Sequence, residues 1–131
     1  MKRYWAGGFG NKYLSADQNA KKLREFLDGS FWQGIYYDKN DKSELAIEAR
    51  DVFSQISVGD EFLIKGLGGR YDLVVHFVGE VVAKDDQNYR LDLASKNVTR
   101  YYGKAPRGQG AGKWFNTILE VRRPQDIQLL F

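Results

Sequence analysis

The 131-residue sequence contains no cysteine and a single histidine, His76. Without cysteine, the chain has no disulfide, no thiolate zinc site and no cysteine nucleophile, a composition that suits a reducing cytosol. His76 lies between Val75 and Phe77 in an apolar, strand-like run. We therefore expect a partly buried strand residue, and neither a histidine-based catalytic triad nor a multi-histidine metal site.

Long apolar runs and an excess of one charge are also missing. No stretch reaches the 18 residues of a membrane-spanning helix, and Met1-Lys2-Arg3 opens no signal-peptide run. The 20 basic and 17 acidic residues leave a net charge of +3, which excludes a surface coated with positive charge. We expect a cytoplasmic protein with no membrane partner.

Aromatic residues, in contrast, are abundant: eight Tyr, eight Phe and three Trp make up 15% of the chain. Aromatic rings fill cores, and they also form the sites of flat ligands. The hydrophobic fraction of 43% and the charged fraction of 28% are ordinary for a folded protein. We expect residues 1–131 to form a single domain, with at least half of the rings in its core.

The N-terminal part of the sequence predicts a short strand over residues 3–6 and then a helix. Glycines end the strand, and Ser15 with Gln18 matches a capping box. The helix is expected to begin at Ala16 and to end near Gly29.

Residues 30–42 read as an irregular connection that is aromatic at its start and polar at its end. Asp41 with Glu44 resembles a second helix cap, and apolar residues follow at helical spacing. The pattern predicts a second helix over residues 42–55.

The remaining sequence changes to the period of β-strands. Consecutive strands joined by short loops pair antiparallel, and a curled antiparallel sheet that hides its edges forms a small barrel. The predicted fold class is therefore α+β, a small curled antiparallel β-barrel with two or three flanking helices. The strand-like segments are residues 61–65, 71–83, 89–94 and 113–121.

Signals for catalysis are weak. The carboxylate pairs Asp85–Asp86 and Asp38–Asp41 lie among turn residues that favour solvent. The run from Arg107 to Lys113 fails as a phosphate-binding P-loop, because the required glycine and Ser/Thr positions hold Arg107 and Trp114. We expect no enzyme, no metal site and no cofactor.

Two glycine loops carry basic residues. Residues 103–112 are flanked by Lys104, Arg107 and Lys113, which suits contact with a sugar-phosphate backbone or simply a hairpin loop. Residues 65–70 join two strands, and their glycines permit a close backbone approach to a ligand or a tight turn.

The three tryptophans lie in separate segments, so only the fold could bring them together. Each alone is more often a core residue. In an extended strand Trp114 shares a face with Asn116, a pattern that favours a ring facing solvent or a ligand.

Four short motifs follow one another along the chain. They are Tyr4-Trp5, Phe31-Trp32-Gln33-Gly34-Ile35, Ile56-Ser57-Val58-Gly59-Asp60-Glu61-Phe62-Leu63-Ile64 and Val78-Gly79-Glu80-Val81-Val82. Their order and approximate separation resemble EVE domains of the PUA-like superfamily, which are related to YTH-type modified-base readers. The residues after the first strand, Ala6-Gly7-Gly8-Phe9, depart from the family's usual apolar residue and Lys-Ser pair.

This resemblance implies a module that binds DNA and takes a flipped, methylated base into an aromatic pocket. It also implies a fused or associated motor or nuclease, as in modification-dependent restriction systems. Trp32 is the first candidate wall of the pocket, Trp114 the second, and Tyr36, Tyr37 and Trp5 are further contributors. The expected phosphate contacts are Lys65, Arg70, Lys104, Arg107 and Lys113.

Two alternatives remain open at this point. A reader of modified RNA would use the same pocket. A protein or peptide interaction module would use exposed aromatics without any nucleic acid, and its binding would respond less to salt.

Overall fold

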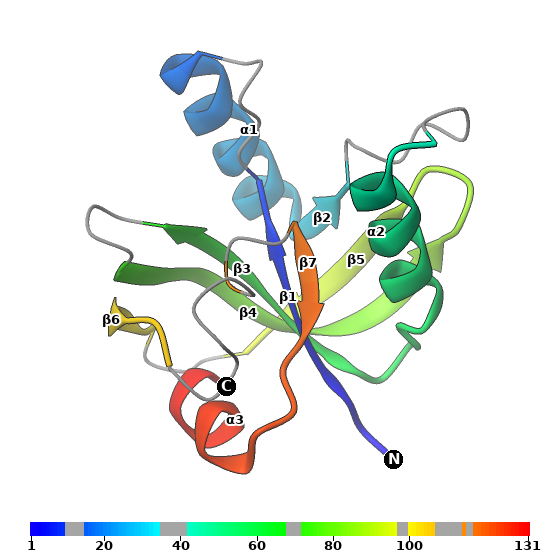
Figure 1. Cartoon of the computed structure of the whole chain (residues 1–131). Coiled ribbons are helices and arrows are strands. Elements are labelled where there is room, and N and C mark those ends of the chain that lie inside the picture. The colour runs from blue at the N-terminus through cyan, green and yellow to red at the C-terminus, as the bar shows by residue number, and fades with distance from the viewer. Residues whose placement is uncertain (10–14, 35–41, 68–71, 97–99, 107–113, 115–116) are drawn as a thin grey trace.

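A computed structural model describes residues 1–9, 15–34, 42–67, 72–96, 100–106, 114 and 117–131. Seven strands and three helices lie in these ranges (Figure 1). In chain order they are β1 (Tyr4–Gly8), α1 (Ala16–Gly29), β2 (Phe31–Gln33), α2 (Glu44–Ser54), β3 (Glu61–Leu67), β4 (Asp72–Asp85), β5 (Arg90–Ser95), β6 (Tyr102–Lys104), β7 (Ile118–Glu120) and α3 (Pro124–Leu130).

The strands form one curled sheet in the order β2-β5-β4-β3-β1-β7, and β6 pairs with β4. The predicted α+β class, with a barrel-like sheet and flanking helices, is confirmed. The sheet is mixed, however, because β1 runs parallel to β3 while the other pairs are antiparallel. The connection through α1, β2 and α2 is long enough to return the chain in the parallel direction.

Irregular pairing helps the sheet to curl. The register of β3 and β4 shifts between Ile64 and Lys65, and that of β4 and β5 shifts between Val81 and Ala83. At each shift β4 has one residue more than its partner strand. An extra residue of this kind bends a strand and increases its twist. The long strand β4 can therefore belong to both halves of the curved sheet (Figure 1).

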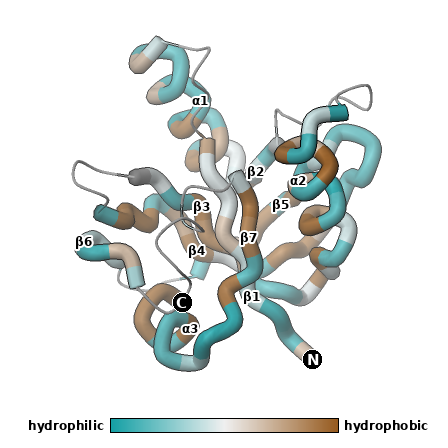
Figure 2. The backbone as a smooth tube through the Cα atoms, in the orientation of Figure 1, coloured by the Kyte–Doolittle hydropathy of each residue, from teal (hydrophilic) through white to brown (hydrophobic). Residues whose placement is uncertain are grey.

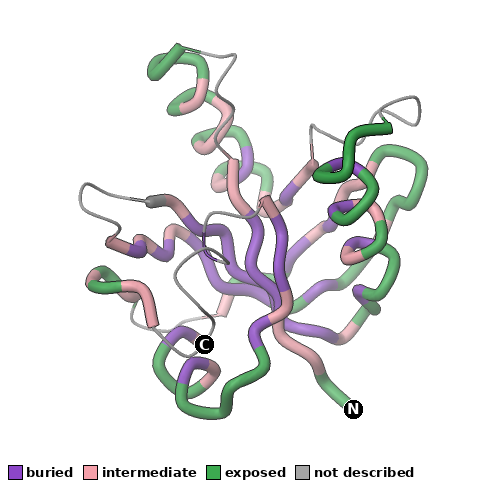
Figure 3. The backbone as a smooth tube through the Cα atoms, in the orientation of Figure 1, coloured by how far each residue is buried: buried purple, intermediate pink, exposed green. Residues whose placement is uncertain are grey.

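Each face of the sheet carries its own core, and the central strands are both apolar and buried (Figures 2 and 3). The core on the side of α1 and α2 is called the helical core and includes Trp5, Trp32, Phe53 and Phe62. The core on the side of α3 is called the C-terminal core and includes Trp114 and Leu130. The sheet separates the two cores.

The first predicted helix is confirmed at both ends. Ser15 Oγ accepts a hydrogen bond from Gln18 N, and Gln18 Oε1 accepts one from Ser15 N, so the capping box is complete. The second helix begins at Glu44 after the N-cap Ser43, two residues later than expected. The cap expected at Asp41 lies outside the described residues.

Other elements differ from the expectation. Residues 31–33 were expected to be irregular but form β2. Residues 102–104, which overlap the start of the predicted loop over 103–112, form β6. The predicted strand over 113–121 is described as a strand only at Ile118–Glu120. The C-terminal segment forms α3, whose Leu130 is buried. No helix in the described ranges is long and apolar enough to cross a bilayer.

Candidate nucleic-acid interface

Trp32 lies inside the helical core, with none of its surface exposed. From β2 its Nε1 donates a hydrogen bond to the Gly8 carbonyl of β1 over 2.8 Å. Its ring is tilted against Phe62, and the two centroids are 5.1 Å apart. The indole thus ties an outer strand to the middle of the sheet and presents no open ring face to a base.

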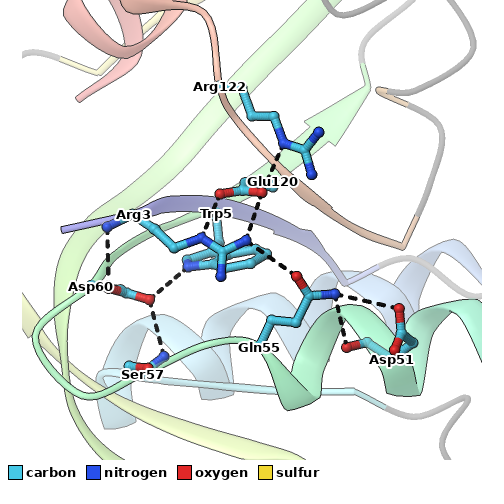
Figure 4. Close-up of polar contacts among 8 residues, drawn as sticks. All are labelled: Arg3, Trp5, Asp51, Gln55, Ser57, Asp60, Glu120 and Arg122. Carbon is cyan, nitrogen blue, oxygen red and sulfur yellow. Dashed lines mark hydrogen bonds and ion pairs between the residues drawn. The ribbon is translucent and has the colours of Figure 1, made fainter. Parts of the chain in front are cut away.

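Trp5 is also buried, and its Nε1 donates to Asp60 Oδ2 over 2.9 Å (Figure 4). The Arg3 guanidinium lies over the Trp5 ring, with its Cζ 4.6 Å from the ring centroid. Asp60 additionally accepts hydrogen bonds from the backbone N–H groups of Arg3 and Ser57. The Tyr-Trp and Val-Gly-Asp motifs of the EVE resemblance therefore meet in one buried contact, where Trp5 stabilises the fold.

Trp114 is 1% exposed, so the expectation of a ring facing solvent or a ligand is wrong. Its Nε1 donates to the Pro106 carbonyl over 3.0 Å, and its ring belongs to the C-terminal core. The expectation assumed strand alternation from residue 113, whereas β7 begins at Ile118. Because the sheet lies between Trp114 and Trp32, the two rings do not form walls of one pocket.

The predicted phosphate contacts differ in their exposure. Lys65 is only 4% exposed, and burial lowers its pKa to about 8. It lies opposite Gly8 in the sheet, where a Cβ on Gly8 would be 3.4 Å from Lys65 Nζ. Lys104 at the end of β6 is exposed. The remaining predicted site residues lie outside the described ranges: Tyr36, Tyr37, Arg70, Arg107 and Lys113.

An aromatic pair that the sequence reasoning did not select lies near the end of β1. Phe9 and His76 meet edge to face with ring centroids 5.4 Å apart, and both are half-buried. They occupy the space beside Gly66, where an added Cβ would be 2.8 Å from His76 Nε2 and 3.2 Å from a Phe9 ring carbon. Gly66 therefore makes room for the pair, and Phe9 packs against the helical core.

Strand β6 brings a third ring to this face. Tyr102 is paired with Val74 and Lys104 with Asp72, so both side chains lie on the Val74 face of the sheet. Gly66 is also paired with Val74, and the His76 ring reaches Gly66 on that face. We call Phe9, His76, Tyr102 and Lys104 the aromatic–basic patch.

The exposure and charge of this patch suit a flat, anionic ligand. Tyr102 is 71% exposed, which is unusual for a large aromatic residue. Burial and the nearby Arg100 cation lower the pKa of His76, so its ring is neutral at pH 7. Arg100 is itself exposed, while Asp72 opposite Lys104 offsets part of the positive charge.

Sequence signals for the patch are faint. Phe9 follows a Gly-Gly pair at a strand end, but its partner His76 is brought into place by the register shift in β4. Tyr102 lies in β6, which was not predicted because the glycines of residues 103–112 indicated a loop. Among the described residues, no three His, Asp or Glu side chains gather as metal ligands would.

No protein-family model and no curated protein matches the chain. The EVE resemblance therefore depends on the motifs themselves, two of which are in contact at Trp5 and Asp60.

Proposed function

We propose that the domain binds nucleic acid and stacks an unpaired or flipped base on the aromatic–basic patch. The observation that carries this proposal is that Tyr102, which is 71% exposed, lies on the face that also holds the Phe9–His76 pair. Stacking of a base on an aromatic side chain contributes about 1–3 kcal/mol. Lys104 and Arg100 then hold the neighbouring phosphates.

The chemistry of the rings favours a methylated base. Phe9 carries no polar group, and a neutral His76 ring adds no positive charge to the stacking surface. Such a surface accepts a methyl group that a fully hydrogen-bonding pocket would reject. The EVE resemblance adds DNA, ahead of RNA, as the nucleic acid that carries this base. We propose that the domain reads methylated DNA in the cytoplasm and acts together with a motor or nuclease.

In this proposal, the buried tryptophans build the scaffold. Trp5 and Trp32 connect strands through their indole N–H groups, and Trp114 fills the C-terminal core. Tyr36 and Tyr37 stay predicted base contacts, and Arg70, Arg107 and Lys113 stay predicted phosphate contacts.

The direct test is fluorescence anisotropy with labelled oligonucleotides of one sequence. Single strands and duplexes of DNA and RNA, each with and without methylated cytosine or adenine, are titrated at two salt concentrations. We expect affinity to be highest for one methylated DNA and to fall as salt rises. Absence of binding to every oligonucleotide at low salt would reject the function.

Variants of Tyr102 locate the site. Tyr102→Ala removes the ring and is expected to weaken binding about 5- to 140-fold, the equivalent of about 1–3 kcal/mol. Tyr102→Phe keeps the ring and is expected to bind nearly as well as the wild type. Val58→Ala is the control for truncating an exposed side chain away from the patch. Unchanged binding by Tyr102→Ala would exclude the patch even if the domain binds nucleic acid elsewhere.

A further inference from the structure

The position of His76 on the aromatic–basic patch follows from the irregular pairing of β4. The register of β3 and β4 shifts around His76, so this residue has no partner on β3. An extra residue of this kind re-aims a side chain and is common beside functional sites. The imidazole lies over Gly66 and against Phe9, where it is half-buried. The irregular pairing and these two contacts therefore hold the ring at the face of the patch.

Arg100 is brought beside His76 by the pairing of β4 with β6. The backbone N–H of Val75 donates to the Tyr101 carbonyl over 2.9 Å, which continues the β4–β6 register one residue beyond β6. The next step of that register places Arg100 opposite His76. Residues two positions apart in a strand share a face, so Arg100 lies on the same face as Tyr102.

His76 and Arg100 form a basic pair without an acidic partner. Arg100 is exposed, and the ion pairs between described residues include neither side chain. Burial, and then repulsion by the Arg100 cation, lowers the pKa of His76, so the ring is neutral in the free protein at pH 7. An anion held between the two groups relieves this repulsion and favours the protonated ring.

Other groups around the imidazole bring little charge to this point. Phe9 at the end of β1 and Gly66 on β3 carry none. The titratable side chains that share the face with His76 are Arg100, Tyr102, Lys104 and Asp72. The tyrosine is uncharged at neutral pH, and the opposed lysine and aspartate lie about 13 Å further along the strands and offset one another. Among the described residues, the charge that acts on the ring is therefore the Arg100 cation.

We propose that His76 and Arg100 together hold one phosphate group of the nucleic acid whose base stacks on Tyr102, and that His76 takes up a proton from solvent as it does so. This contact rests on the proposed function and adds His76 to its phosphate ligands. In the protonated ring both nitrogens are donors, which suits phosphate oxygens. Because binding favours the protonated form, affinity is highest at acidic pH, and this gain is lost as the pH rises through the pKa of His76 in the complex.

The test is direct because His76 is the only histidine of the chain, so its Cε1–H resonance in NMR spectra is unambiguous. Titration between about pH 5.5 and about pH 8 gives its pKa in the protein alone, with a methylated single-stranded DNA oligonucleotide, and with inorganic phosphate. We expect the oligonucleotide to raise this pKa by about one unit, and its affinity to rise up to about tenfold as the pH falls across the range. Inorganic phosphate is expected to raise the pKa far less, because it lacks the base that stacks on Tyr102.

Variants separate this contact from other effects of pH. Arg100→Gln is expected to raise the pKa of His76 in the free protein and to reduce the further rise caused by the oligonucleotide. Arg123→Gln removes an exposed cation at the start of α3 and is the matched control, which is expected to change neither value. His76→Gln is expected to make affinity independent of pH across the same range.

The outcomes distinguish this contact from the proposed function. Binding of the oligonucleotide without any change in the pKa of His76 would overturn the contact and leave the proposed function standing. An equal rise with inorganic phosphate would overturn the assignment of the site to nucleic acid. Absence of binding by every oligonucleotide would reject the proposed function and this contact with it.

Discussion

At the residue scale, Gly7 and Trp32 share a space that a side chain would fill. A Cβ on Gly7 would lie 2.4 Å from a Phe62 ring carbon and 2.7 Å from two indole atoms of Trp32. These distances are far below van der Waals contact, and both rings are held within the helical core. The absence of a side chain at residue 7 therefore allows the Trp32 indole to cross to β1.

We predict that Gly7→Ala lowers the free energy of unfolding by about 1–3 kcal/mol, because the added methyl group overpacks the core. Gly8→Ala is the matched control, since its Cβ would meet only the flexible end of Lys65 at 3.4 Å and Thr117 O at 3.8 Å. Urea denaturation of both variants measures the difference. Equal destabilisation by the two substitutions would contradict the packing seen at Gly7.

Lys65 provides a second prediction at this scale, based on pH. Its pKa is about 8 in the folded protein against an ordinary value of 10.5, because burial disfavours the charged amine. Between these values the unfolded chain binds more protons than the native one, so this residue's contribution to stability rises with pH. Replacing the charge with an apolar side chain should therefore help most at neutral pH.

We expect Lys65→Met to stabilise the protein by up to about 3 kcal/mol at pH 7, and this advantage to shrink steadily as the pH approaches 10. Denaturant unfolding of both proteins across this range gives the difference, in which the titration of other groups cancels. An advantage that stays constant with pH would show that Lys65 keeps an ordinary pKa.

At the scale of elements, α1 was the most predictable part of the fold. Its capping box depends on Ser15 and Gln18 alone, which are close in the sequence, so the local pattern specified the helix start. The α2 cap is Ser43 and not the predicted Asp41, because the Ser43 hydroxyl accepts a hydrogen bond from Ala46 N. Helix ends depend on hydrogen bonds between residues that are close in the sequence, so a capping pattern places them closely even where it selects a neighbouring residue.

We predict that Ser15→Ala lowers stability by about 1 kcal/mol through the loss of the bond to Gln18 N. Ser54→Ala is the control, since that hydroxyl donates only to the Asp51 carbonyl at the end of α2. Thermal unfolding followed by circular dichroism compares the two. A larger loss for Ser54→Ala would show that the cap does not stabilise α1.

The aromatic–basic patch could not be predicted from the sequence, because it depends on how the strands pair. It needs the β4 register shift at His76, the pairing of Tyr102 with Val74 and the return of β1 beside β3, all of which are long-range contacts. Period-2 alternation reports which residues share a face only after a strand has been placed correctly. The error at Trp114 has this origin.

At the scale of the whole molecule, a net charge of +3 leaves binding to nucleic acid dependent on where the charges lie. Lys104 faces solvent on the proposed site, and Asp72 lies opposite it. The two residues should therefore change affinity in opposite directions.

For duplex DNA we predict that Lys104→Ala makes the plot of log affinity against log salt shallower by about 0.9, the loss of one phosphate contact. Asp72→Asn should instead raise the affinity at low salt, because a repulsive carboxylate is removed. Arg123→Ala, an exposed cation at the start of α3, serves as the control. An unchanged slope for Lys104→Ala would remove this residue from the interface.

The position of β1 also bears on how the chain folds. Its neighbours are β3 on one side and β7 on the other, so the earliest strand of the chain pairs with the last. Contacts between distant parts of a chain cost loop-closure entropy before they are rewarded, which slows folding. On a ribosome, β1 waits for the emergence of β7 before both of its edges are paired. We therefore expect a slow folder whose sheet closes in a late, concerted step.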